Sequence, residues 1–179
     1  MEKPLAMGLR KPPSRLLSED EIRQLKDDIL AIGADETVFV YNSEQVRGTC
    51  YRPQDDKVHA KGNVLGDSNS THPRDLMSSR AVLAHEYYGH RPYREKYLSE
   101  FEMIDLSDDE SLLTLSNRGW IDEFRASYVA AKNAPGLSDQ ERYYLVLDAL
   151  ERAKEANISI SYNDFIRRVL YGQDKIEWQ

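Results

Sequence analysis

The stretch Ala81–Arg91 reads AVLAHEYYGHR, and its pattern decides the fold of this 179-residue chain. An apolar run at helical spacing delivers His85 and Glu86 together and His90 five residues after the first histidine. Neutral imidazole is a good zinc ligand, and a carboxylate beside such a ligand can take a proton from a water molecule. The stretch therefore predicts a helix that carries a metal site with an adjacent base, which is Glu86.

The spacing of the two histidines requires an irregular helix. Five residues at the α-helical rotation leave two side chains about 140° apart, too far around the helix to reach one ion. A local widening of the π-helical type removes this difference, and such bulges are frequent at functional sites. Gly89 precedes the second histidine, and a glycine inside a helix favours a geometric role because it costs about 1 kcal/mol relative to alanine. We expect a π-bulge between His85 and His90.

A catalytic zinc site uses three protein ligands, so a third ligand must come from another element. The segment Trp120–Ser127, WIDEFRAS, offers a carboxylate on an expected helix. We favour Glu123, which lies one turn from Ser127 and beside the apolar Phe124. Asp122 is the alternative, and helical phase alone does not decide between the two.

The chemistry expected of these residues is zinc-dependent hydrolysis. Zn²⁺ held by His85, His90 and Glu123 would lower the pKa of a bound water to about 7, and Glu86 would act as general base. Other polar side chains are candidates for contact with the substrate. They are His72, Tyr88, Tyr143 and Tyr144, and for His72 a helix cap and for the tyrosines a place in the core are the simpler interpretations.

Composition limits the function classes further. The formal net charge is -7 without a basic stripe, which argues against nucleic acid as a partner, and no segment is apolar enough to span a membrane. The single Cys50 excludes an internal disulfide. The opening residues carry prolines instead of the apolar stretch of a signal peptide, so we expect a cytoplasmic protein, with secretion by a specialised route left open.

The rest of the chain indicates one α+β domain. We expect a flexible arm at residues 1–15 and a single metallohydrolase domain at 16–179. Capping boxes at Ser18 and Ser138 predict two helix starts. A small, mostly antiparallel sheet is expected from segments 37–41, 48–52 and 57–61. Helices are expected at 18–33, about 75–91 continuing towards 97 after a break near Pro92, 120–132, 138–153 and 162–171, the last three forming a C-terminal bundle.

Two short motifs resemble those of a known family. HEYYGH and DEFRAS are similar to HExxGH and EExRAE of the dipeptidyl peptidase III metallopeptidases. The resemblance implies a zincin-like fold, His85, His90 and Glu123 as zinc ligands and Glu86 as the catalytic glutamate. It covers two stretches only, and Asp122 and Ser127 replace glutamates of the family motif. In size the chain is similar to compact zincin domains of mobile-element or toxin-associated metallopeptidases.

Zincins of this type bind peptide along an edge strand, for which segment 57–63 is our candidate. The leading hypothesis is therefore a zinc metallopeptidase that acts on peptides or proteins, with the oligomeric state open. The alternative is a non-catalytic binding or regulatory module that zinc stabilises. A third hypothesis is a metal-free helical domain in which the histidines pack in the core.

Overall fold

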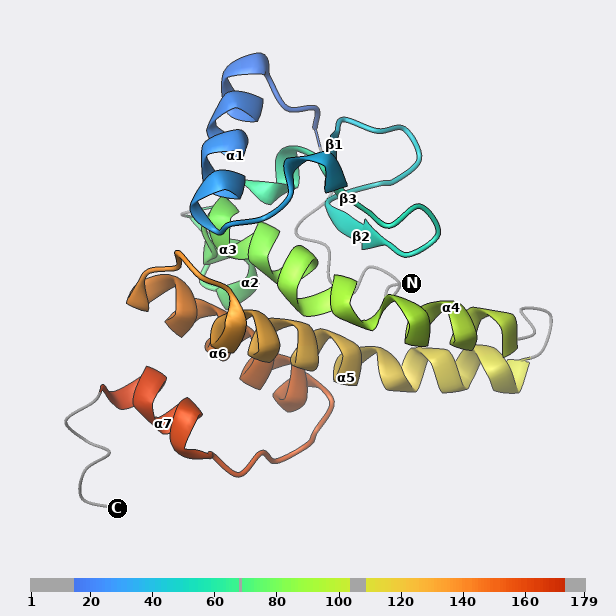
Figure 1. The fold of residues 1–179 in the computed structure, drawn as a ribbon. Coiled ribbons are helices and arrows are strands. Elements are labelled where there is room, and N and C mark those ends of the chain that lie inside the picture. Colours follow the sequence, from blue (N-terminus) through green and yellow to red (C-terminus); the bar gives the residue numbers. More distant parts are fainter. Residues whose placement is uncertain (1–14, 68, 104–108, 173–179) are drawn as a thin grey trace.

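The computed structural model describes residues 15–67, 69–103 and 109–172, so the predicted arm at 1–15 lies almost wholly outside the described residues. The fold is α+β, with the sheet and the first helix on one side of a central helical segment and the C-terminal helices on the other (Figure 1). No helix within these described ranges is long and apolar enough to cross a membrane.

The first helix, α1 (Glu19–Ala31), begins at the predicted capping box. The Ser18 hydroxyl accepts from the Glu21 amide, and the Glu21 carboxylate accepts from the Ser18 amide. The helix ends before Gly33, whose φ of +67° suits glycine best. Leu25 and Ile29 on its inner face are fully buried, and this face packs on the central segment.

The sheet is mixed, so the prediction of a mostly antiparallel sheet is wrong in part. Its strands β1 (Phe39–Tyr41), β2 (Cys50–Arg52) and β3 (Lys57–Ala60) lie in the order β1-β3-β2. The short turn between β2 and β3 makes that pair antiparallel, whereas β1 pairs parallel to β3. Alternation along a strand reports which face is buried and not the direction of its neighbours, so the sequence does not reveal this pairing.

The predicted edge strand is also wrong. Within segment 57–63, residues Lys57–Ala60 form β3, which pairs on both sides, so β1 and β2 are the edges of this sheet, and a 3-10 turn, Gly62–Val64, follows. Val58 and Ala60 are fully buried, as expected for a central strand.

The central segment is built from short helical pieces. They are α2 (Pro73–Leu76), α3 (Ser79–Ala84), the π-helix η4 (His85–His90), the 3-10 turn η5 (Arg91–Tyr93) and α4 (Arg94–Met103). The predicted start near Asp75 is wrong, because Ser78 caps a new helix by accepting from the Ala81 amide. The predicted break at Pro92 is confirmed, since this proline sits in the first turn of η5.

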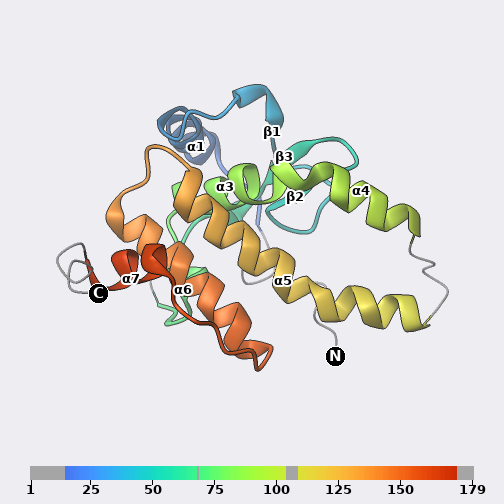
Figure 2. The same ribbon diagram turned by 60° about the horizontal axis from the view of Figure 1, so that its bottom comes forward.

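Three helices complete the fold, namely α5 (Asp109–Asn133), α6 (Asp139–Glu155) and α7 (Asp164–Tyr171). The second capping box, at Ser138 and Glu141, is confirmed. Helix α5 begins eleven residues before the predicted start at Trp120, because the segment before Trp120, although rich in Asp and Ser, also contains good helix formers such as Leu112 and Leu113. Figures 1 and 2 show α5 and α6 beneath the central segment, with α7 against α6.

The backbone of the π-helix approaches that of α5 closely at Gly89. A Cβ atom added there would lie 2.7 Å from both the Cα and the carbonyl carbon of Ala126 and closer still to its carbonyl oxygen. These atoms belong to the backbone of a helix and have no room to move aside. The glycine therefore serves the packing of two helices in addition to the bulge that the sequence predicts.

We predict that Gly89→Ala destabilises the fold by about 2 to 3 kcal/mol, because the added methyl group overpacks a backbone contact. In an unconstrained helix the same change would stabilise by about 1 kcal/mol, so the sign of the change is diagnostic. Urea unfolding followed by circular dichroism measures it, and a more stable variant would contradict the close approach described here.

Candidate metal centre

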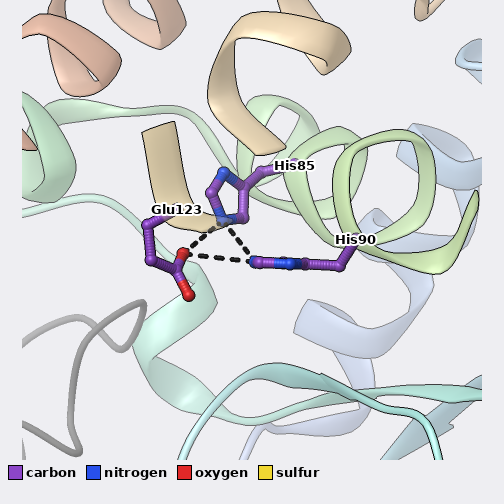
Figure 3. A group of neighbouring side chains, drawn as sticks. All are labelled: His85, His90 and Glu123. Atoms are coloured by element: carbon purple, nitrogen blue, oxygen red, sulfur yellow. Dashed lines mark hydrogen bonds and ion pairs between the residues drawn. The ribbon is translucent and has the colours of Figure 1, made fainter. Parts of the chain in front are cut away.

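Three side chains converge from two helical elements (Figure 3). His85 Nε2 lies 3.0 Å from Glu123 Oε1, His90 Nε2 lies 3.2 Å from the same oxygen, and the two Nε2 atoms are 3.1 Å apart. His85 and His90 are buried, at 3% and 8% exposure. The structure thus brings together the three residues that the sequence proposes as ligands.

The predicted π-helix is confirmed and explains how both histidines reach one point. Residues His85–His90 form a continuous π-helical stretch between α3 and η5. The wider turn places residues five apart on the same face, and the two imidazole rings stand edge to face with centroids 4.8 Å apart. The local irregularity is therefore the feature that creates the pair.

Glu123 and Asp122 make different contacts in the structure. Glu123 reaches both histidines from the second half of α5. Asp122 instead accepts from Arg125 at 2.9 Å on the neighbouring side of the helix. Of the two carboxylates that helical phase left open, Glu123 is the one placed at the cluster.

The Nδ1 atoms of both histidines are also occupied. His85 Nδ1 lies 2.8 Å from the hydroxyl of Ser127, one turn after Glu123 on α5. His90 Nδ1 lies 2.8 Å from the hydroxyl of Tyr97 on α4, which also accepts from Arg125. Partners at Nδ1 fix the ring planes and direct both Nε2 atoms to the meeting point, as outer partners do for histidine ligands.

Glu86 lies beside the cluster and faces the sheet. Its carboxylate accepts a 2.9 Å hydrogen bond from the amide of Tyr51 on β2 and is 3% exposed. Burial raises the pKa of Glu86, although the neighbouring His85 and His90 act in the opposite direction. A carboxyl group with a raised pKa is suited to exchanging protons near neutral pH.

The ion pair within the cluster is strong. Burial alone would lower the pKa of His90, but the Glu123 carboxylate outweighs it and raises the pKa well above its usual value. Burial likewise favours neutral Glu123, yet His90, His85 and Arg152 hold the pKa of Glu123 well below its usual value. A positive charge is therefore favoured where the two Nε2 atoms and the carboxylate oxygen meet.

The donor set fits a zinc ion. Zinc prefers imidazole nitrogen and carboxylate oxygen at about 2.0 to 2.2 Å in tetrahedral geometry, which places ligand atoms about 3.3 Å from one another. The three atoms here are separated by 3.0 to 3.2 Å, near that value. Three protein ligands leave a fourth position for water or substrate.

The other candidates from the sequence are not brought to this cluster. Tyr88 donates to the Ile32 carbonyl at the end of α1, at 2.6 Å. Tyr143 and Tyr144 contact each other on α6; the first is 36% exposed and the second packs on the core. His72 caps α2 by accepting from the Arg74 amide, the simpler role considered for it.

A second group of potential ligand atoms contains His72, Glu151 and Glu155. His72 Nδ1 accepts the cap hydrogen bond, so in the neutral ring Nε2 carries the proton, 3.2 Å from Glu155. Metal binding at Nε2 would move the proton to Nδ1 and break the cap hydrogen bond from the Arg74 amide, and the Arg74 side chain also pairs with Glu155. This group is better described as an ion-pair network.

Sequence reasoning missed several residues around the cluster. Tyr97, Asp148 and Arg152 are not identified from the sequence, where Ser127 serves only to orient Glu123 and as a departure from a motif. The Asp148 and Arg152 pair has helical i, i+4 spacing that is visible in the sequence, but this spacing usually marks a solvated face. Only the packing of α6 on α5 shows that both are buried, at 0% and 3% exposure.

Comparisons with protein-family models, with curated proteins and with solved structures gave no match for this chain.

We predict that Glu123→Ala abolishes stoichiometric zinc binding, whereas Asp122→Ala retains it, because only Glu123 shares a meeting point with His85 and His90. Elemental analysis of both variants and the wild type, purified identically without chelator or metal-affinity tag, makes the comparison. Equal zinc content in the two variants would remove Glu123 from the ligand set. Circular dichroism of both establishes that each is folded.

Proposed function

We propose that this protein is a zinc-dependent metallopeptidase that hydrolyses peptide bonds in peptide or protein substrates. The observation that carries the proposal is the convergence of His85, His90 and Glu123 on one point beside the buried carboxylate of Glu86. A structural zinc site needs four protein ligands, and the described residues supply three at this point. An open fourth position next to a base favours catalysis over a purely structural ion.

Bound zinc would act as a Lewis acid and lower the pKa of water at the open position to about 7. Glu86 directly follows the ligand His85, so its carboxylate would accept a proton from the attacking water and later deliver it to the leaving amine. Its burial supports this role, because burial raises the pKa of the carboxyl group and makes it a better base. The Tyr51 amide holds one carboxylate oxygen and leaves the other for proton exchange.

The position of β2 supports a peptide as substrate. Strand β2 is an edge of the three-stranded sheet, and it packs against the π-helix. The Tyr51 amide points from β2 to Glu86, which shows that the edge turned away from β3 faces the base. An extended peptide that adds to such an edge would bring its backbone alongside Glu86.

A second candidate function, a zinc-stabilised binding or regulatory module, is favoured by the burial of the cluster. Glu86 and His85 are each 3% exposed, and a hydrogen bond engages Glu86. A module of this kind binds zinc as part of its folding and cuts no peptide, so removal of zinc would unfold it.

We predict that Glu86→Gln lowers peptide hydrolysis by about 10²- to 10⁴-fold while zinc content stays near that of the wild type, because the amide keeps the shape and loses the base. A peptide library read by mass spectrometry supplies the activity, and elemental analysis supplies the zinc content. His85→Ala is the control that should lose both.

Two outcomes would contradict the proposal of a peptidase. One is zinc-loaded wild-type protein that cuts no member of the library and unfolds on chelation, which is the result expected of the binding module. The other is Glu86→Gln with wild-type activity.

A further inference from the structure

Five side chains from the π-helix, α5 and α6 form a closed ring. His85 Nδ1 contacts the Ser127 hydroxyl at 2.8 Å, and this hydroxyl donates to Asp148 at 2.6 Å. Asp148 accepts from Arg152 Nε at 3.2 Å, and Arg152 Nη1 lies 3.5 Å from Glu123, which returns to His85 Nε2 at 3.0 Å.

The ring follows from two matching helical spacings. Helix α5 presents Glu123 and Ser127 four residues apart, one to each nitrogen of the His85 ring. Helix α6 presents Asp148 and Arg152, also four residues apart, one to each of those α5 side chains. The two helices pack along each other, so the pairs stay in register.

The direction of the hydrogen bonds determines where the proton of His85 lies. Asp148 pairs with Arg152 at 3.2 Å and lies 3.6 Å from Arg74, so the group is a carboxylate that only accepts. Burial raises the pKa of Asp148, but the surrounding positive charges and the Ser127 hydrogen bond together lower it below its usual value. The single proton of the Ser127 hydroxyl is therefore given to Asp148. Ser127 can then only accept from His85, which requires a proton on Nδ1 of the imidazole.

Arg152 completes the arrangement on the carboxylate side. Its guanidinium is buried at 3% exposure and lies between Asp148 and Glu123. Arg152 Nη1 has no hydrogen-bond partner within the described residues, so its contact with Glu123 is that of a neighbouring charge. Its contact is with Oε1, the same oxygen that faces the histidines, and the positive charge helps to keep Glu123 ionised.

We propose that Ser127 and Asp148 are positioning residues that place the His85 proton on Nδ1 and so leave Nε2 free to bind a metal, with α6 thereby part of the metal centre. The benefit to metal binding rests on the proposed function. The location of the proton on Nδ1 follows from the hydrogen bonds and does not require a metal. In water the neutral imidazole prefers its proton on Nε2, the nitrogen that would have to ligate. The hydrogen bonds from His85 to Ser127 and from Ser127 to Asp148 reverse that preference, so metal binding requires no change of tautomer.

The test reads the histidine ring directly. ¹H–¹⁵N correlation spectra of metal-stripped, full-length protein in mildly alkaline buffer report which ring nitrogen of each of the four histidines carries a proton. His85 is assigned from the signal that disappears in His85→Gln. We expect a protonated Nδ1 at His85 in the wild type and an unprotonated Nδ1 as the main form in Ser127→Ala. An unprotonated Nδ1 in the wild type would overturn the proposal.

The chain contains a matched control for the serine. Ser79 on α3 also donates to a buried aspartate, Asp28, at 2.6 Å, but it lies six residues before His85 and outside the ring. Ser79→Ala should leave the His85 proton on Nδ1, whereas Ser127→Ala should not. Asp148→Asn is the second variant: an amide can donate to the hydroxyl, so both tautomers of His85 should appear.

Zinc affinity, measured by competition with a chromogenic chelator, separates this proposal from the proposed function. We expect Ser127→Ala to bind zinc about 10- to 100-fold more weakly than the wild type and Ser79→Ala to match the wild type. Unchanged affinity in a Ser127→Ala variant whose Nδ1 has lost its proton would overturn the positioning role. If the wild type itself binds no zinc, the metallopeptidase fails, and the ring spectra still decide the tautomer.

Discussion

The close approach of the π-helix to α5 is the constraint on which the site depends. Gly89 lets the backbone of the central segment touch the backbone of α5 at Ala126, and any larger residue would separate them. The ligands lie on either side of this contact, with Glu123 and Ser127 close to Ala126 in sequence. A side chain at position 89 would move both away from His85, whose two nitrogens reach them at 3.0 and 2.8 Å.

The local features of the fold could be predicted from the sequence, because their causes are local. The capping boxes at Ser18 and Ser138 and the π-bulge between His85 and His90 each follow from residues a few positions apart. The approach of Glu123 to the histidines was also predicted, since a zinc site with two histidines requires a third ligand and few carboxylates lie on a suitable helix.

The features that could not be predicted depend on tertiary packing. The parallel pairing of β1 with β3 depends on how the chain crosses from one strand to the next, which strand patterning does not encode. Asp148 and Arg152 look like an exposed helical ion pair in sequence and become buried only because α6 packs on α5. The Ser127 hydroxyl gains its role from this burial, since it connects the Asp148 carboxylate to a ligand that the carboxylate does not reach itself.

Burial also explains why the charged groups of the network lie together. A buried charge without a partner costs several kcal/mol, so Asp148 and Glu123 can be buried here only because the Arg152 guanidinium lies between them. The helices supply the ligands and everything that holds them, whereas the sheet supplies the Tyr51 amide that holds Glu86. The proposed metal ligands and the proposed base thus rest on different parts of the fold. A displacement of β2 would move Glu86 relative to the cluster of His85, His90 and Glu123, which the helices keep in place. If the cluster binds zinc, the packing of β2 on the π-helix is the contact that couples metal binding to catalysis.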